Sequence, residues 1–98
     1  MADIIFEWDK SKDLRNRKKH GVSFEEASTV FVDEKALLIQ DPDHSEAEDR
    51  FLLLGLSSNL RILLVCHCYR QGDRVIRLIS ARKASQSEQH QYWERWKA

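Results

Sequence analysis

Residues 61–82 read RILLVCHCYR-QGD-RVIRLISAR, and this stretch decides the fold. Two runs rich in apolar and β-branched residues stand on either side of a Gln71-Gly72-Asp73 turn. The pattern predicts a hairpin with strands over 61–70 and 74–82. Because a turn this short joins neighbouring strands, the two strands should be antiparallel.

The rest of the chain supplies further strands and helices around this hairpin. The predicted elements are a short strand over 4–8, a helix over 10–20, a helix opened by the capping box at 23–26, strands over 36–41 and 50–57, and a final helix opened by a capping box at 85–88. Phe24, Ala27, Val30 and Phe31 should form the buried side of the second helix, and Tyr92, Trp93 and Trp96 should cover the sheet from the last helix. We therefore expect an α+β fold: a mainly antiparallel sheet of four strands, a short N-terminal strand, two N-terminal helices and one C-terminal helix.

Composition indicates one ordinary globular domain. The 98 residues are 42% hydrophobic and 33% charged, close to the lower size at which a chain buries its own core. No apolar run approaches the roughly 18 residues of a membrane span, and the start of the chain has acids where a signal peptide has basic residues. The expected location is therefore the cytoplasm, away from membranes.

Two cysteines, Cys66 and Cys68, lie two residues apart in a predicted strand. This spacing puts them on one face, in a geometry poorly suited to a mutual disulfide, so we expect reduced core residues. A lone Cys-His-Cys tripeptide also lacks the ligand number and spacing of a structural zinc site. No metal or other cofactor is expected.

Opposite charges occupy different stretches of a chain whose total, 16 basic against 16 acidic side chains, is neutral. Residues 10–20 hold six Lys and Arg against Asp13, residues 25–49 hold nine acids against Lys35, and residues 50–83 hold seven Lys and Arg against Asp73. For the first stretch, a helix surface that is simply exposed to solvent is as good an explanation as a binding site. In the third stretch the arginines alternate with strand residues, so a sheet would hold them in fixed positions.

The pattern of alternate residues assigns these arginines to strand faces. One face of the strand over 61–70 carries Arg61, Leu63, Val65, His67 and Tyr69, and the other carries Ile62, Leu64, Cys66, Cys68 and Arg70. In the next strand, Arg77 shares a face with Val75 and Ile79, and Arg74, Ser80 and Arg82 share the other. Strand register decides which of these side chains converge.

A converged set of this kind suits cleavage of RNA by its own 2′-hydroxyl, which needs no metal. Arginine grips phosphate through two hydrogen bonds and stays charged, and a His or Tyr moves protons. His67 beside Tyr69 fits either a proton carrier or a packed core residue. His20 fits either an RNA contact or a favourable cation at a helix end, and His44 either a proton carrier or a loop residue.

Other chemistries are not supported. Residues 55–59 (GLSSN) lack the second glycine of a nucleophile elbow, which argues against serine hydrolase chemistry. With three glycines in the chain there is no glycine-rich phosphate loop. The basic helix over 10–20 has too few apolar positions to pack as half of a helix-turn-helix, which argues against direct DNA recognition.

Several separate blocks, in one order, resemble the BrnT toxins. They are FEWD, the NxxKHGVSFEEA block from Asn16 to Ala27, VFVDE, DPDHSEAEDRF, the Arg61 strand, and RLISARKAS closing with Glu88 and Tyr92. The likeness runs from about residue 6 to residue 92, so 1–98 is expected to be one BrnT-like domain. The resemblance implies a RelE-like fold and an endoribonuclease toxin of a type II toxin-antitoxin module that inhibits translation.

It also implies partners, and together with the strand pattern it indicates site residues. The expected partners are a BrnA-like antitoxin with a ribbon-helix-helix part that binds operator DNA, in a hetero-oligomer, and an RNA substrate, either isolated or on the ribosome; contact with DNA would be indirect. The candidate catalytic residues are Arg61, His67, Arg77 and Arg82, and the candidate RNA-binding residues are Lys19, His20, Arg50, Tyr69 and Lys83. The alternative is a non-catalytic module that holds its antitoxin and tunes repression of the operon.

Overall fold

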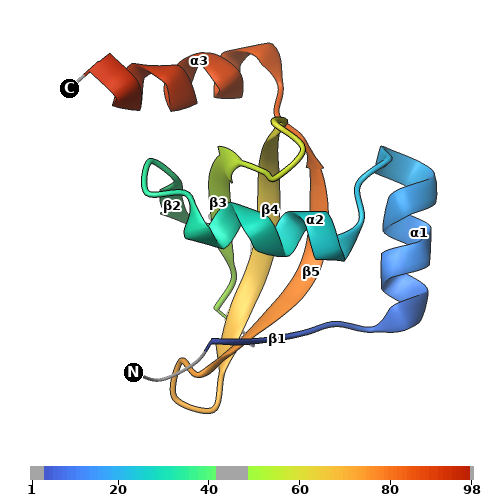
Figure 1. The fold of residues 1–98 in the computed structure, drawn as a ribbon. Coiled ribbons are helices and arrows are strands. Elements are labelled where there is room, and N and C mark those ends of the chain that lie inside the picture. The colour runs from blue at the N-terminus through green and yellow to red at the C-terminus, as the bar shows by residue number, and fades with distance from the viewer. Residues whose placement is uncertain (1–3, 42–48, 98) are drawn as a thin grey trace.

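A single mixed sheet of five strands forms the centre of the computed structural model, which describes residues 4–41 and 49–97. The elements in chain order are β1 (Ile5–Glu7), α1 (Lys10–His20), α2 (Phe24–Thr29), the 3₁₀ turn η1 (Val30–Val32), β2 (Leu37–Gln40), β3 (Phe51–Leu56), β4 (Ile62–Arg70), β5 (Val75–Lys83), α3 (Gln86–Glu94) and the 3₁₀ turn η2 (Arg95–Lys97). The strand order is β1-β5-β4-β3-β2, with α1 beside β5 and α2 across the strands (Figure 1). The connection over 42–48, with His44, lies outside the described residues.

The predicted antiparallel meander is present, since β2, β3, β4 and β5 pair in sequence order and in antiparallel fashion. The sheet as a whole differs from the prediction. β1 joins it as a fifth strand, parallel to β5, with Ile5 opposite Val75 and Glu7 opposite Arg77. A three-residue strand carries no pattern that specifies a distant partner, so its place at the free edge of β5 was not predictable from the sequence.

The helix boundaries follow the capping residues. Asp9 caps α1, and Gly21, with a φ of 69°, ends it in the left-handed conformation. Ser23 caps α2, and Ser85 forms a reciprocal capping box with Glu88 at the start of α3. The helix arrangement differs from the prediction at the far ends, because α2 and α3 each continue into a 3₁₀ turn instead of remaining α-helical.

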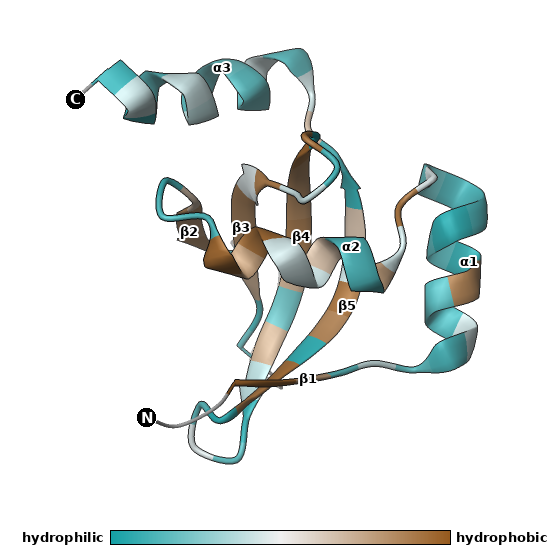
Figure 2. Cartoon of the chain, viewed as in Figure 1, coloured by the Kyte–Doolittle hydropathy of each residue, from teal (hydrophilic) through white to brown (hydrophobic). Residues whose placement is uncertain are grey.

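Two layers of apolar residues cover the two faces of the sheet. On what we call the α2 face, a core cluster comprises Val22, Phe24, Ala27 and Val30 with Leu53, Leu63, Val65, Ile76, Leu78 and Ala81. On the opposite α3 face, Tyr92 packs with Leu54, Ile62 and Ala84. The strands are correspondingly hydrophobic in Figure 2, whereas α1 is hydrophilic over most of its length. Of the three aromatic residues expected to cover the sheet, Tyr92 is fully buried, and Trp93 and Trp96 are about half exposed.

An irregularity in β5 changes which side chains share a face. Cys66 pairs with Ser80 but the next residue of β4, His67, pairs with Leu78, so Ile79 is an extra residue in β5. The phase of the alternation therefore shifts at Ile79. As a result, Arg77, Ser80 and Arg82 lie opposite Cys68, Cys66 and Leu64, on the α3 face. The expectation that Arg77 and Arg82 occupy opposite faces is wrong, because strict period two ignores the extra residue.

Among the described residues, no helix is long and apolar enough to span a bilayer.

Candidate functional site

Three of the residues singled out in the sequence converge around one hollow on the α3 face. This site hollow has a volume of about 330 Å³. Its walls are formed by His20 from α1, Arg50 at the start of β3 and Arg82 from β5. The remaining lining residues are Asp41, Leu52, Leu64, Cys66, Ser80 and Ala81. Two guanidinium groups and an imidazole thus surround a concave surface with a partly apolar floor.

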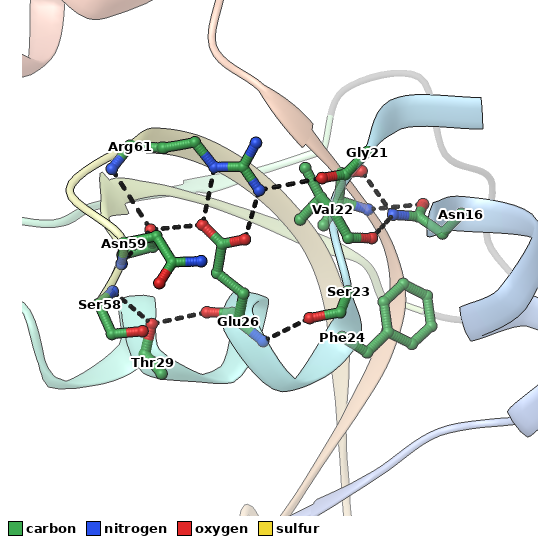
Figure 3. Close-up of polar contacts among 12 residues, drawn as sticks. Asn16, Gly21, Val22, Ser23, Phe24, Glu26, Thr29, Ser58, Asn59 and Arg61 are labelled. Carbon is green, nitrogen blue, oxygen red and sulfur yellow. Dashed lines mark hydrogen bonds and ion pairs between the residues drawn. The ribbon is translucent and has the colours of Figure 1, made fainter. Parts of the chain in front are cut away.

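His20 reaches the site because Asn16 fixes α1 to the edge of β5. The buried Asn16 side chain donates to the carbonyl oxygens of Ala81 and Val22, both at 2.8 Å, and accepts from the N–H of Ala81 at 3.1 Å. The amide therefore binds Ala81 as a neighbouring strand would, on the side of β5 that faces away from β4. Figure 3 shows Asn16 beside Val22 and Gly21. His20 follows Asn16 by one helical turn and so lies on the same side of α1.

Arg82 is positioned by α3. Its two terminal nitrogens donate to the carboxylate oxygens of Glu88 at 2.8 and 2.9 Å, and one of them also donates to the carbonyl of Lys83 at 3.2 Å. Hydrogen bonding to Arg82 lowers the pKa of Glu88 to about 2, so this carboxylate stays charged at neutral pH. A guanidinium carries more N–H donors than these bonds use, and the Arg82 side chain is 42% exposed. Arg82 can therefore bind a phosphate while α3 holds it.

The hydrogen bonding of neighbouring strands positions Arg50. Just beyond the ends of β2 and β3, the N–H of Asp41 donates to the carbonyl of Arg50 at 2.9 Å. Both side chains line the site hollow. Arg50 was predicted from the sequence and Asp41 was not, because an acid at the end of a short strand has no distinguishing pattern.

Arg61, the first of the candidate catalytic arginines, lies elsewhere, in an ion pair with Glu26. Arg61 donates through Nε to Glu26 at 3.0 Å, makes a second, short contact through Nη2, and also donates to the carbonyl of Gly21 at 3.0 Å (Figure 3). Ser57 donates to the same carboxylate at 2.7 Å. The bond from Arg61 is the main reason that the pKa of Glu26 is lowered despite burial. Arg61 thus neutralises a carboxylate whose side chain is 6% exposed.

Arg77 shares the α3 face with Arg82 but is not among the residues that line the site hollow. It donates to Glu7 of β1 at 2.7 Å, and Arg70 of β4 approaches the same carboxylate at 3.9 Å. The contact joins β1 to β5 at the end of the sheet distant from α3.

His67 and Tyr69 project into the core on the α2 face, so the sheet separates them from the site hollow. His67 is fully buried, and its ring stands edge-on to Phe31 with centroids 4.8 Å apart. Its Nε2 lies 3.3 Å from the hydroxyl of the half-buried Tyr69. Burial lowers the pKa of His67, which favours the neutral ring. These are the contacts of the packed residue that the sequence analysis kept as an alternative.

The two candidate lysines differ in position. Lys19 lines a hollow next to the first, together with Lys12 and Arg15 of the same helix, which the sequence analysis counted in the basic stretch but did not single out. Lys83 is exposed at the end of β5 and is not part of the site hollow.

Both cysteines are buried free thiols, and Cys66 lies in the floor of the site hollow. Within residues 4–41 and 49–97, no group of three or more His, Cys, Asp or Glu side chains is arranged to hold a metal ion. Among the residues that line the hollow, Arg50 and Arg82 carry positive charge, Asp41 is a carboxylate, and His20 contributes an imidazole. Such a set can bind a phosphate diester and move a proton beside it.

Comparison with known proteins identifies the family. The sequence model for the ribonuclease toxin BrnT of type II toxin-antitoxin systems matches residues 8–88. The crystal structure of the Brucella abortus ribonuclease toxin BrnT is similar, with a TM-score of 0.61 and 27% sequence identity over 88% of this chain and 100% of that one. No match was found among curated protein sequences. Because the family match spans most of the chain, the protein belongs to the BrnT family of ribonuclease toxins of type II toxin-antitoxin systems.

Proposed function

We propose that this protein is an endoribonuclease that cleaves RNA at the site hollow, without a metal ion, and inhibits translation until a BrnA-like antitoxin binds it. The observation that carries the proposal is the convergence of Arg50, Arg82 and His20 on one concave surface. Family membership supplies the reaction class, and the hollow supplies groups suited to it.

In the proposed reaction the 2′-oxygen of the RNA attacks the adjacent phosphorus, and the bond from phosphorus to the 5′-oxygen of the next nucleotide breaks. The products are a 2′,3′-cyclic phosphate and a 5′-hydroxyl. Arg50 and Arg82 stabilise the negative charge that builds on the phosphorane oxygens. His20 transfers one of the two protons, either to the leaving 5′-oxygen or from the 2′-hydroxyl, and solvent water exchanges the other. The proton-transfer role thus falls to His20 and not to His67, which lies on the opposite face of the sheet.

The test is cleavage of an RNA oligonucleotide by purified protein, with and without EDTA, and with a single 2′-deoxy substitution at the cleaved position. We expect cleavage to persist in EDTA and to stop at the deoxy position. His20→Ala should lower kcat/KM by about a hundredfold or more. Arg82→Ala, combined with Glu88→Gln so that no carboxylate loses its cation, should lower it by a similar factor.

Arg74→Ala is the matched control, because Arg74 is an exposed arginine just before the opposite end of β5. Its kcat/KM should stay within about twofold of the wild type. Cleavage that survives loss of both His20 and Arg82 would show that the reaction occurs elsewhere. In cells, expression without antitoxin should arrest growth, and the His20→Ala variant should not.

A second candidate function is a non-catalytic module that binds the antitoxin and tunes repression. It is favoured by the carboxylate partners of three candidate arginines, since Arg61, Arg77 and Arg82 each form an ion pair within the protein. Normal growth on expression of soluble protein, with antitoxin binding intact, would support this candidate over the enzyme.

A further inference from the structure

Helix α1 carries basic side chains on two flanks that face different hollows. Lys12, Arg15 and Lys19 line a hollow between α1 and β5, which we call the outer hollow. Arg17 and Lys18 line another, the lateral hollow, on the side of α1 that faces the Arg61–Glu26 pair. The two flanks of α1 therefore carry similar charge but line different hollows. We distinguish their roles by which hollow adjoins the site hollow.

The outer hollow continues directly into the site hollow. The two share His20 and Ser80 as lining residues, and their volumes are similar, about 340 and 330 Å³. Ile79, the extra residue of β5, contributes an apolar wall to the outer hollow. The lateral hollow shares none of its lining residues with the site hollow. A chain bound at Arg82 and His20 would thus meet Lys19, Arg15 and Lys12 next, and not Arg17 or Lys18.

Helix α1 places the basic residues of the outer hollow at regular positions along its axis. Lys12 and Lys19 are two helical turns apart, which corresponds to roughly 10 Å along the helix axis. Asn16, between them, binds the backbone of Ala81 and so holds this flank of α1 against β5. A groove with basic residues along its length, beside a rigid helix, suits the phosphate backbone of a single strand.

We propose that the outer hollow binds the backbone of single-stranded RNA beside the reacting nucleotide, with Lys12 and Arg15 contacting a phosphate outside the one that is cleaved. This inference rests on the proposed function for the position of the reacting phosphate. An antitoxin segment is the competing ligand for the same cations. RNA is favoured because the outer hollow shares walls with the proposed reaction site, so one continuous strand would occupy both.

The experiment compares two double variants on two substrates. Lys12→Ala/Arg15→Ala removes cations of the outer hollow, and Arg17→Ala/Lys18→Ala removes the same kinds of charge from the opposite flank. The substrates are a dinucleotide, which has only the reacting phosphate, and oligonucleotides extended on the 5′ or the 3′ side. For each, kcat and KM are measured, together with the Kd for a 2′-O-methyl oligonucleotide that cannot be cleaved.

For Lys12→Ala/Arg15→Ala we expect KM and Kd for an oligonucleotide extended on one side to rise about tenfold, with kcat unchanged and the dinucleotide unaffected. Arg17→Ala/Lys18→Ala should match the wild type in every measurement. Equal losses of RNA affinity in both double variants would overturn the proposal, because they would indicate general electrostatic attraction and no specific binding in the outer hollow. It would be overturned equally by Lys12→Ala/Arg15→Ala weakening antitoxin binding while leaving KM and Kd for RNA unchanged.

The experiment distinguishes a wrong reaction assignment from a wrong assignment of the outer hollow, because cleavage and binding are measured separately. If the wild-type protein cleaves no RNA, the reaction assignment fails. The Kd for the uncleavable oligonucleotide then still tests whether the outer hollow binds RNA. Weaker binding confined to Lys12→Ala/Arg15→Ala supports the proposal, and unchanged binding in that variant overturns it.

Discussion

Two histidines of this protein show how the environment of a residue decides its chemistry. His20 lines the site hollow, where an imidazole can meet a substrate. His67 is fully buried among Phe31, Phe51 and Tyr69 on the other face of the sheet. From the sequence, His67 was predicted as a candidate catalytic residue, with a packed core residue as the alternative, and His20 as a candidate RNA-binding residue.

Replacement of His67 by leucine tests this assignment. Because the two side chains have similar volumes and the ring is largely packed in apolar contacts, His67→Leu should change the free energy of unfolding by less than about 1.5 kcal/mol. Cleavage of RNA by the folded variant should match the wild type. A loss of cleavage as large as that expected for His20→Ala would show that His67 takes part in the reaction.

The same variant should alter the dependence of stability on pH. Burial lowers the pKa of His67 below its ordinary 6.5, so the unfolded chain binds the proton more readily. The stability that this neutral histidine contributes is present above pH 6.5 and is lost as pH falls through the lowered pKa of the folded state. Chemical denaturation between pH 7 and pH 5 should therefore show a smaller loss of stability for His67→Leu than for the wild type.

At the scale of elements, the Arg61–Glu26 pair joins three parts of the fold. Glu26 lies on α2, Arg61 precedes β4, and the carbonyl of Gly21 that Arg61 binds ends α1. Ser57, just after the end of β3, also donates to the Glu26 carboxylate. These contacts give Arg61 a structural role. They also keep the end of α1, and with it His20, at a defined place beside the sheet.

Arg61→Ala should therefore destabilise the fold, by about 2 kcal/mol. Breaking a buried ion pair leaves a buried carboxylate without its cation, and the cost here is reduced because Arg61 is 32% exposed. Urea denaturation measures the effect. The double variant Arg61→Ala/Glu26→Gln should recover part of the loss, because the remaining group is then neutral. Lost cleavage in Arg61→Ala with unchanged stability would contradict this structural role.

Close packing between elements also explains one glycine. A Cβ on Gly55 of β3 would lie 2.7 Å from Val30 of η1 and 2.9 Å from Ala36, both closer than real contacts allow. The absence of a side chain at Gly55 thus lets η1 and the segment before β2 approach the sheet. It serves packing, in agreement with the rejection of residues 55–59 as a nucleophile elbow.

At the scale of the whole molecule, the neutral total charge conceals a local surplus at the proposed RNA path. Arg50, Arg82 and His20 line one hollow and Lys12, Arg15 and Lys19 line the next. Binding should respond to these local cations and not to the net charge, because each phosphate that a cation neutralises releases counterions.

The affinity for an uncleavable 2′-O-methyl oligonucleotide should therefore fall steeply with salt. For two to four phosphate contacts on a single strand, a plot of log affinity against log salt concentration should have a slope of about −1.5 to −3. Fluorescence anisotropy over a salt series measures it. A slope near zero would show that the hollows do not hold the RNA backbone.

The sequence by itself determined the elements, because caps, turns and hydrophobic period are local signals. Asp9, Gly21, Ser23 and Ser85 mark helix ends, and the hairpin around Gly72 sets the antiparallel order of the last strands. The family blocks likewise identified a BrnT-like chain, which the family match confirmed. His20, Arg50 and Arg82 were all named as candidates from the sequence.

Only the tertiary structure decided which of the candidates meet. The extra residue Ile79 places Arg77 and Arg82 on one face. Their carboxylate partners differ: Arg77 pairs with Glu7, 70 residues away in the sequence, and Arg82 pairs with Glu88, six residues away. The parallel pairing of β1 with β5 joins residues 70 positions apart, and the hydrogen bonds between Asn16 and Ala81 join residues 65 positions apart. Such contacts depend on register and on packing between distant elements, and neither leaves a periodic signal along the chain.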